Sequence, residues 1–412
     1  MAGREADVVP LFGSSADADD VRLSTGLPGL DRVLGGGVVP GSVVLLAGEP
    51  GIGKSTRILQ AVAGLAGSGT PAVVASGEES RAQVAGRAGR LGLRGEALRY
   101  AAGRDLEQVL AAAAAERPGV LVVDSIQTLR SEDVTGTAGG VGQVRACADA
   151  LVGLAKREGC AIVLVGHVTK DGDLAGPRTL EHAVDAVLTF SGDARSGLRT
   201  LVSGKNRFGA EGEVAWFEMT PTGLAEADPS ALLADSAGEP GAALALPLAG
   251  RRAVAAEVQG LVVDSDGPPR RHASGLDPRR LSMIAAVLEQ CGVRVGRAEV
   301  YAAASGGLRI DDPGADLAVA AALASARSGR PPPADTAFVG EISLTGTVRQ
   351  GPGMGLRLAA ARAAGVRTVV APGGSEGSPA GGDVVIRPVR HVREALSWSR
   401  VDRGVRKAEN GL

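Results

Sequence analysis

Residues 48–56 read GEPGIGKST and match the pattern G-x-x-x-x-G-K-[S/T] in full. The defining positions are Gly48, Gly53, Lys54 and Ser55. The stretch follows an apolar run, SVVLLAG, and opens the segment STRILQAVAGLAGSG, which is apolar at helical spacing. A glycine-rich turn between a strand and a helix can also form without a ligand. The complete pattern in this strand-to-helix context nevertheless predicts a loop that binds phosphate.

The chemistry of such a loop assigns a role to each residue type. Glycines let the backbone curve so that its N–H groups face phosphate oxygens, and the helix N-terminus adds its dipole. Lys54 is expected to reach the β- and γ-phosphates of ATP, and Ser55 to hold Mg²⁺. The predicted nucleotide contacts are Gly48, Glu49, Pro50, Gly51, Ile52, Gly53, Lys54, Ser55, Thr56 and Asp124.

Carboxylates are needed near this loop, and two further runs supply them. The apolar run in GVLVVDSIQTL ends at Asp124, which is predicted to be the second Mg²⁺ ligand because ligands bind at the carboxyl ends of parallel strands. Asp124 could instead cap a following helix. The run VVASGEES places Glu78 and Glu79 after another strand. Glu78 is the first choice, with Glu79 in reserve, for the residue that orients the attacking water.

The pattern of apolar runs predicts an α/β fold. Runs at 42–48, 72–77, 119–125 and 161–167 are nearly continuous Val, Leu and Ile, and helix-like stretches separate them. This is typical of a parallel sheet covered on both faces. Further strand-like runs follow, at 185–192 and 198–203. The organisation predicted from composition is a flexible tail at 1–20, an ATPase domain at 21–227, a linker at 228–243, an α+β unit at 244–399 and a tail at 400–412.

Bulk composition excludes few classes. The chain has 412 residues, 44% apolar and 22% charged, with a net charge of -2, so any nucleic-acid binding needs a local basic patch. The three cysteines, Cys147, Cys160 and Cys291, show no CxxC spacing, so neither a zinc site nor a disulfide framework is expected. No signal peptide or membrane-spanning run is apparent. We therefore expect a cytoplasmic protein without a membrane partner.

The segment 203–219, SGKNRFGAEGEVAWFEM, carries two cations around an asparagine. Apolar runs flank KNRFG on both sides, so it is predicted to be a loop between two strands. Lys205 and Arg207 then need a negative partner. The simplest alternative is a solvated basic hairpin turn.

Taken together, these motifs resemble the bacterial RadA (Sms) family of DNA-repair proteins. The resemblance runs from about residue 23 to 396 and is most specific in KNRFG and in GHVTKDGDLAGPRTLEHAVDAVL. It implies a RecA-like ATPase core that hydrolyses ATP with Mg²⁺ and assembles as a hexameric ring. It also implies that Lys205 and Arg207 neutralise the γ-phosphate of ATP bound to the next subunit, which makes them catalytic candidates beside Lys54 and Glu78.

The C-terminal unit resembles the Lon protease domain, a ribosomal S5 domain 2-like fold, as it occurs in that family; GEISLTGTVRQGPGMGLRLAAARAAGV is the clearest stretch. Lon-type proteolysis needs a Ser nucleophile and a Lys base. Gly314 aligns with the Ser, and no Lys occurs between Lys205 and Lys407, so a non-proteolytic scaffold is expected. Members of the family usually carry an N-terminal four-cysteine zinc finger. Residues 1–20 contain no Cys, so either this form lacks the finger or the true start lies upstream.

Two stretches are candidates for DNA contact. GPPRRHASGLDPRRL holds Arg270, Arg271, Arg279 and Arg280, whose guanidinium forks suit phosphates, although they could be solvated or ion-paired instead. HVTKDGDLAGPRTLEH corresponds to the DNA-facing loop of RecA-like proteins and adds Lys170 and Arg178. His167, at its start, could sense the γ-phosphate or be structural.

The resulting hypothesis is an ATP-dependent motor that binds single-stranded DNA and promotes branch migration of recombination intermediates. The resemblance adds a RecA-type recombinase as partner. Two alternatives are a signalling ATPase of the KaiC type and an ATP-dependent Lon-type protease. KNRFG and the Lon-like unit argue against the first, and the missing Ser–Lys pair argues against the second.

Overall fold

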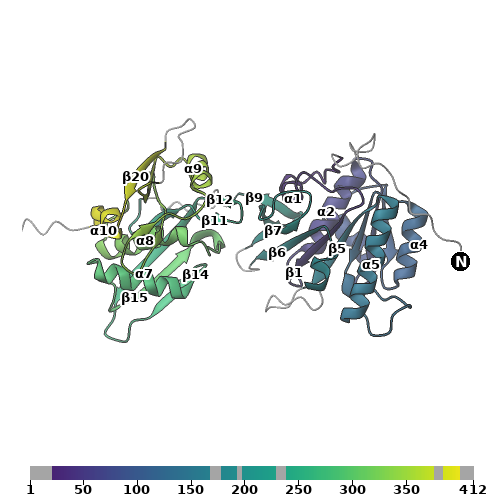
Figure 1. Cartoon of the computed structure of the whole chain (residues 1–412), viewed down its shortest axis with the longest axis horizontal. Helices are drawn as coiled ribbons and strands as arrows, with labels where there is room; N and C mark the ends of the chain where they lie inside the picture. Colours follow the sequence, from purple (N-terminus) through teal and green to yellow (C-terminus); the bar gives the residue numbers. More distant parts are fainter. Residues whose placement is uncertain (1–20, 168–177, 193–196, 229–237, 375–383, 400–412) are drawn as a thin grey trace, which may run out of the picture. The chain divides into compact units, whose positions relative to one another are not determined.

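The computed structural model describes residues 21–167, 178–192, 197–228, 238–374 and 384–399 (Figure 1). The chain divides into two compact units, with the main boundary between Glu226 and Ala227. Each unit has its own sheet. No helix within the described ranges is both long enough and apolar enough to span a bilayer.

The first unit is built on a nine-stranded sheet in the order β3-β2-β4-β5-β1-β6-β7-β8-β9. The strands are β1 (Val43–Gly48), β2 (Ala72–Ser76), β3 (Leu98–Ala102), β4 (Val120–Asp124), β5 (Ala161–His167), β6 (Ala186–Gly192), β7 (Leu198–Asn206), β8 (Val214–Thr220) and β9 (Gly223–Ala227). The strands from β3 to β6 are parallel, which confirms the parallel sheet predicted from the runs that form β1, β2, β4 and β5. β7 then pairs with β6 in the antiparallel sense, so the sheet as a whole is mixed.

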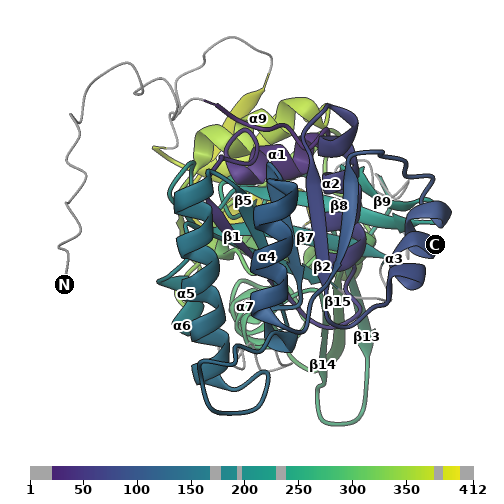
Figure 2. The same ribbon diagram turned by 90° about the vertical axis from the view of Figure 1, so that its right-hand side faces the viewer.

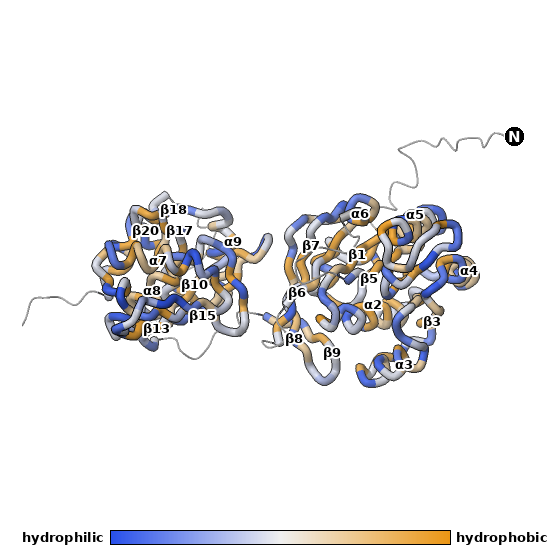
Figure 3. Tube along the Cα trace, turned by 90° about the horizontal axis from the view of Figure 1, so that it is seen from below, coloured by the Kyte–Doolittle hydropathy of each residue, from blue (hydrophilic) through white to orange (hydrophobic). Residues whose placement is uncertain are grey.

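Helices cover both faces of this sheet. They are α1 (Pro28–Leu34), α2 (Lys54–Gly67), α3 (Arg81–Arg90), α4 (Leu106–Glu116), α5 (Val141–Glu158) and the short α6 (Arg178–Glu181), with a 3₁₀ turn η2 (Ile126–Thr128). Side chains of β1 alternate between the faces: Val44 and Leu46 pack in the core with α1 and α2, and Val43 and Leu45 in the core with α5. Figure 2 shows α4 and α5 lying over one face, and Figure 3 shows the apolar central strands β1 and β5.

Two elements of the first unit depart from the sequence prediction. β3 was not foreseen, because LRYAA is short and its side chains are at most half buried. β7 extends to Asn206, so Lys205 and Asn206 lie in the strand and not in a loop. Only Arg207 and the residues after it form the turn. Asn206 continues the strand because its side chain is buried and donates to the carbonyl of Val33.

The second unit holds a seven-stranded mixed sheet in the order β14-β15-β13-β10-β16-β19-β20 and two two-stranded ladders, β11-β12 and β17-β18. The strands are β10 (Ala242–Ala245), β11 (Leu248–Ala249), β12 (Arg252–Ala253), β13 (Ala256–Asp264), β14 (Arg271–Ser274), β15 (Ala298–Ala304), β16 (Thr336–Phe338), β17 (Glu341–Ile342), β18 (Val348–Arg349), β19 (Thr368–Pro372) and β20 (Val385–Val389). The first two residues of β10 overlap the end of the predicted linker, 228–243; residues 229–237 of that linker lie outside the described ranges.

The helices of the second unit are α7 (Pro278–Gln290), α8 (Asp316–Ser328), α9 (Met354–Ala363) and α10 (Val392–Ala395), with 3₁₀ turns η4 (Ser305–Gly307), η5 (Pro313–Ala315) and η6 (Ser397–Ser399). α8 is the central helix: ten consecutive residues from Asp316 to Ser325 are buried. A helix that is apolar all round belongs in a core. Its first charged residue, Asp316, therefore needs a partner, which Arg280 of α7 provides.

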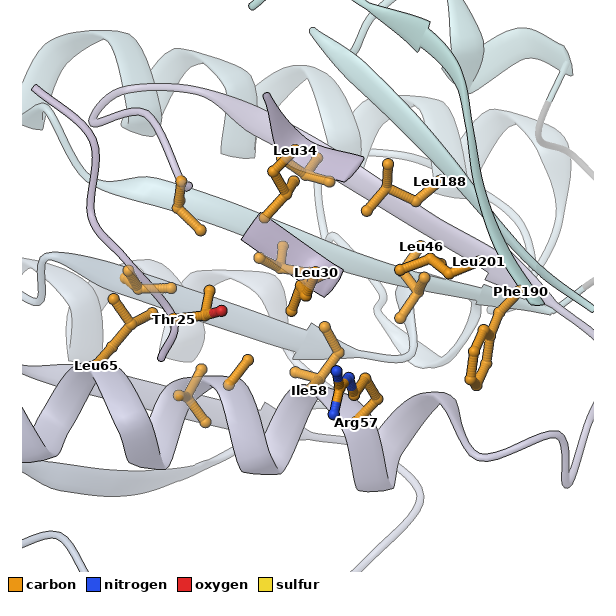
Figure 4. Close-up of a pocket in the computed structure, with 16 residues that line it drawn as sticks. Thr25, Leu30, Leu34, Leu46, Arg57, Ile58, Leu65, Leu188, Phe190 and Leu201 are labelled. Atoms are coloured by element: carbon orange, nitrogen blue, oxygen red, sulfur yellow. The ribbon is translucent and has the colours of Figure 1, made fainter. Parts of the chain in front are cut away.

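A small apolar cavity lies inside the first unit between α1, α2 and the sheet (Figure 4). Leu30, Leu46 and Phe190 are among its lining residues, and no residue of the 48–56 loop is. Arg57 is the one charged residue among those that line this cavity. Its guanidinium stacks on Phe217 at 4.0 Å and donates to the carbonyl of Leu224, and burial lowers its pKa to about 10. The cavity is thus a gap in the core and does not resemble a nucleotide site.

Candidate nucleotide-binding site

The 48–56 loop connects the end of β1 to the start of α2, as its pattern predicts. Two of its glycines are required by the geometry. A Cβ on Gly48 would lie 2.4 Å from the carbonyl oxygen of Phe190 in the adjacent β6. Gly53 has φ +112°, a value that disfavours any other residue. The sheet thus holds the loop at both ends.

Lys54 turns back into this loop. Its Nζ donates to the carbonyls of Gly48 (2.7 Å) and Glu49 (2.9 Å), and the residue is 4% exposed. Burial lowers the pKa of the Lys54 amine, while the nearby carboxylates of Asp124, Glu78 and Glu49 oppose that shift. An ammonium in this position can exchange its carbonyl partners for phosphate oxygens.

Ser55 and Asp124 meet beside Lys54. The Ser55 hydroxyl hydrogen-bonds the Asp124 carboxylate, and burial raises the pKa of Asp124 despite that bond. Asp124 does not cap the turn that follows, because the N-cap residue of η2 is Ser125. A hydroxyl and a carboxylate are oxygen donors that Mg²⁺ accepts, with nucleotide phosphates and waters completing its octahedron. The donor set therefore fits the predicted ion. Among the described residues, no group of three or more His, Cys, Asp or Glu side chains could hold a metal on its own.

Glu78 and Glu79, which the sequence could not separate, have different surroundings. Oε1 of Glu78 accepts from Ser125 Oγ (2.8 Å) and lies 3.1 Å from His167 Nε2. Glu79 points to α3, where it pairs with Arg87. Only Glu78 therefore faces the loop. Its position at the end of β2 puts it at the same edge of the sheet as Lys54 and Asp124.

His167 and two residues after Asp124 complete the cluster. The Nδ1 atom of His167 lies 3.2 Å from Lys54 Nζ, and Gln127 donates to the His167 carbonyl. His167 had two equally open interpretations, a γ-phosphate sensor or a structural residue, and this placement favours the first. Ser125 and Gln127 were not predicted. The signal available for them was their position directly after the carboxyl end of β4, where parallel sheets gather ligand-binding groups.

Lys205 and Arg207 lie at the opposite end of the sheet. Lys205 Nζ donates to the carbonyls of Glu181 (2.8 Å) and Val184 (2.7 Å). Arg207 Nη1 pairs with Oδ1 of Asp185 at 3.0 Å. Asp185 also accepts from the backbone N–H of Val43, the first residue of β1. The two cations are therefore separated from the loop after Gly48 by the length of β1, roughly 17 Å at 3.3 Å per residue.

The predicted DNA contacts divide into two groups. Arg271 donates to the carbonyls of Val295 and Gly296, both at 3.1 Å, and Arg280 pairs with Asp316 (Nε to Oδ1, 2.9 Å) and Glu341. These two arginines already have partners within the protein. The stretch therefore does not present all four of its arginines to a DNA ligand. Arg270 and Arg279 are exposed. Lys170 lies outside the described residues, as does the side chain of Arg178, which begins α6.

At Gly314, the position predicted to align with the protease nucleophile, a neighbouring side chain occupies the space that a Cβ would need. Gly314 packs against the guanidinium of Arg357, and a Cβ on Gly314 would lie 2.6 Å from Nη2. Arg357 is fully buried, pairs with Asp312 at 2.7 Å and donates to the carbonyl of Leu246. Burial raises the Asp312 pKa, but the hydrogen bonds from Arg357 and from two backbone N–H groups outweigh it, so the net pKa is lowered.

Comparison with known proteins adds family information. Residues 14–173 match the AAA domain family, and residues 297–396 match the Lon protease (S16) C-terminal proteolytic domain family. The chain is 45% identical over 386 residues to a DNA repair protein RadA of Brucella abortus, covering 91% of this chain and 83% of that protein. The corresponding protein of Pseudomonas aeruginosa is 43% identical over 96% of this chain and 88% of its own length. That of Bacillus subtilis is 40% identical, over 93% and 85%.

Proposed function

This chain belongs to the RadA family of DNA repair proteins, and from that membership we propose that it is a Mg²⁺-dependent ATP hydrolase stimulated by single-stranded DNA. The observation that carries the proposal is the convergence of Lys54, Asp124, Ser55 and Glu78 at one edge of the parallel sheet. They come from three separate motifs, because Lys54 and Ser55 share the 48–56 loop. Together they supply a cation for the phosphates, oxygen ligands for Mg²⁺ and a carboxylate that can orient water.

The residues then divide the work of phosphoryl transfer. The backbone of 48–56 and Lys54 bind the phosphates, and Ser55 and Asp124 hold Mg²⁺, which neutralises charge that develops on the phosphates. Glu78 orients the attacking water and accepts its proton. His167 lies between Lys54 and Glu78. The ring is thus in a position to respond to the γ-phosphate, because either side chain changes partners when phosphate enters.

Lys205 and Arg207 act on the ATP of a neighbouring subunit in this proposal. Their place at the other end of β1 supports this, because they are too far from their own loop to touch its nucleotide. A ring, with six subunits as the working number, brings this end of each sheet to the loop of the next. A cation supplied in trans is worth roughly 10³–10⁵ in rate in related phosphoryl-transfer systems.

The proposed role of hydrolysis is movement along single-stranded DNA, with branch migration of recombination intermediates as the outcome and a RecA-type recombinase as partner. Arg270, Arg279, Lys170 and Arg178 are the proposed phosphate contacts. The Lon-like unit is proposed to be a scaffold without peptidase activity, because Arg357 occupies the space beside Gly314 and the unit contains no Lys.

One experiment tests this function directly. ATP hydrolysis by the full chain is measured with Mg²⁺, with and without single-stranded DNA, next to Lys54→Ala and next to casein degradation by the same preparation. We expect DNA to stimulate hydrolysis, Lys54→Ala to abolish it, and casein to stay intact. Wild-type turnover by Lys54→Ala would move the nucleotide site elsewhere. Hydrolysis that ignores DNA would favour a signalling ATPase, and casein degradation a protease.

A further inference from the structure

Arg199 stands at the start of β7 and contacts the phosphate loop from outside the motif. It is 6% exposed, and its Nε donates to the carbonyl oxygen of Ile52 at 3.2 Å. Its strand partner is Gly192, at the end of β6 that lies beside Gly48. Ile52 and Arg199 are 147 residues apart in the chain. No pattern in residues 48–56 therefore reports this contact.

The contact matters because of which peptide group it holds. In a planar trans peptide the C=O and the following N–H point in opposite directions. An arginine that fixes the Ile52 carbonyl away from the loop centre therefore turns the Gly53 N–H toward it. Gly53 has φ +112° and no side chain that could restrain this peptide plane. A contact from elsewhere in the chain is therefore needed to fix its orientation. The Gly53 N–H is one of the donors that a phosphate cradle requires.

We propose that Arg199 is a positioning residue of the nucleotide site, which orients the Ile52–Gly53 peptide so that the Gly53 N–H faces the phosphates. The inference rests on the ATP site proposed above and extends it to a residue that touches neither nucleotide nor metal. The desolvated guanidinium makes the contact strong, since hydrogen bonds from charged groups contribute more than neutral ones. Leu224 and Met219 also lie close to Gly53, at 3.1 and 3.4 Å from where a Cβ would stand, which leaves the loop little freedom to compensate.

The test compares Arg199→Met and Arg199→Lys with Arg32→Met. Arg32 is the control, because it also donates to a backbone carbonyl of the antiparallel strands, that of Val214, although it is more exposed than Arg199 and also pairs with Glu226. Equilibrium binding of a fluorescent ATP analogue and the KM for ATP are measured on folded protein, with the melting temperature recorded for each. We expect Arg199→Met to weaken binding and raise KM about tenfold or more, the loss typical of one charge-assisted hydrogen bond. Arg199→Lys, which keeps a donor, should recover part of that loss.

The outcomes separate this inference from the function on which it rests. If Arg199→Met binds the nucleotide within twofold of Arg32→Met, the positioning role is overturned, even if the melting temperature of Arg199→Met falls. A purely structural arginine would lower stability without changing nucleotide affinity. If wild-type protein binds the analogue but hydrolyses no ATP, the proposed function fails, while the affinity comparison still decides the role of Arg199.

Discussion

The imidazole of His167 bridges to the carboxylate of Glu78, with Nε2 3.1 Å from Oε1. The other ring nitrogen lies 3.2 Å from Lys54 Nζ. One imidazole therefore connects the lysine proposed to bind phosphate with the carboxylate proposed to orient water. Glu79, the next residue, is directed away from this line and pairs with Arg87. Adjacent carboxylates therefore have separable roles.

Replacing Glu78 by Gln keeps the shape of the side chain and removes its basicity. We expect ATP binding to persist and hydrolysis to fall by roughly 10²–10⁴, the usual contribution of a positioned general base. Glu79→Gln is the matched control and should stay near the wild-type rate. Steady-state hydrolysis and nucleotide binding measure both. A slow Glu79→Gln beside an active Glu78→Gln would reverse the assignment.

Shared active sites can be detected by mixing two inactive variants. Arg207→Ala keeps its own phosphate loop but spoils the site it faces, and Lys54→Ala does the reverse. In a mixed ring some interfaces pair an intact loop with an intact cation, so part of the ATPase activity should return. Hydrolysis by the mixture is compared with each variant alone after subunit exchange is verified. No gain over the sum of the two would mean that Arg207 acts within its own chain or elsewhere.

The exposed arginines of the second unit predict a salt effect on DNA binding. Arg279→Ala should weaken binding of single-stranded DNA whatever its sequence and flatten the plot of log affinity against log salt by about 1. Arg309→Ala is the control, because Arg309 is also exposed but already paired with Asp311. Affinity is measured by fluorescence anisotropy over a salt series. An unchanged slope for Arg279→Ala would place the phosphate contacts elsewhere.

Asp312 and Arg357 form a buried pair whose disruption should destabilise the second unit. Asp312→Asn keeps the shape of the side chain but leaves the guanidinium of Arg357 buried without a counter-charge. We expect a loss of about 3–5 kcal/mol, which is typical when one partner of a buried pair is removed. Chemical denaturation followed by circular dichroism measures it. The exposed pair Arg309–Asp311 is the control, and Asp311→Asn should change stability by less than about 1 kcal/mol.

The same pair predicts a pH dependence. Because the pKa of Asp312 is lowered in the folded protein, the unfolded chain binds its proton first as the pH falls. The stabilisation from this carboxylate is therefore complete above the pKa of an unfolded Asp, about 3.9, and is lost below it. Asp312→Asn lacks this titration, so its unfolding free energy should depend less steeply on pH below about 4. Parallel pH curves for the two proteins would show that Asp312 is not the group responsible.

Local patterns predicted much of this molecule because their information lies within a few residues. The 48–56 motif, the apolar runs of β1, β2, β4 and β5, and the carboxylates at the ends of β2 and β4 are all visible in short windows. The different surroundings of Glu78 and Glu79 are not visible in this way, because their partners Ser125, His167 and Arg87 come close only in the folded chain. Adjacent identical residues cannot be separated by a pattern.

The basic stretch at 270–280 shows the same limit on the surface. The four arginines look equivalent in the sequence. In the structure Arg280 pairs with Asp316, the first residue of α8, and Arg271 donates to backbone carbonyls just before β15. Lys205 was assigned to a loop because glycine and charge surround it. The strand continues through it because its ammonium has two carbonyl acceptors and Asn206 is buried next to it. Long-range partners decided each of these cases.

The packing around Gly314 also constrains how this sequence can evolve. A serine at 314 would put its Cβ 2.6 Å from the buried Arg357 guanidinium, so that substitution alone is strained. Changing Arg357 first would leave Asp312 as a buried carboxylate without its cation. Removing Arg357 first is expected to cost about 3–5 kcal/mol, a large part of the roughly 5–15 kcal/mol typical of a folded domain, and introducing serine first requires the buried guanidinium to shift. The packing of Arg357 against Gly314 therefore disfavours a serine at this position on stability grounds alone, whatever the unit does.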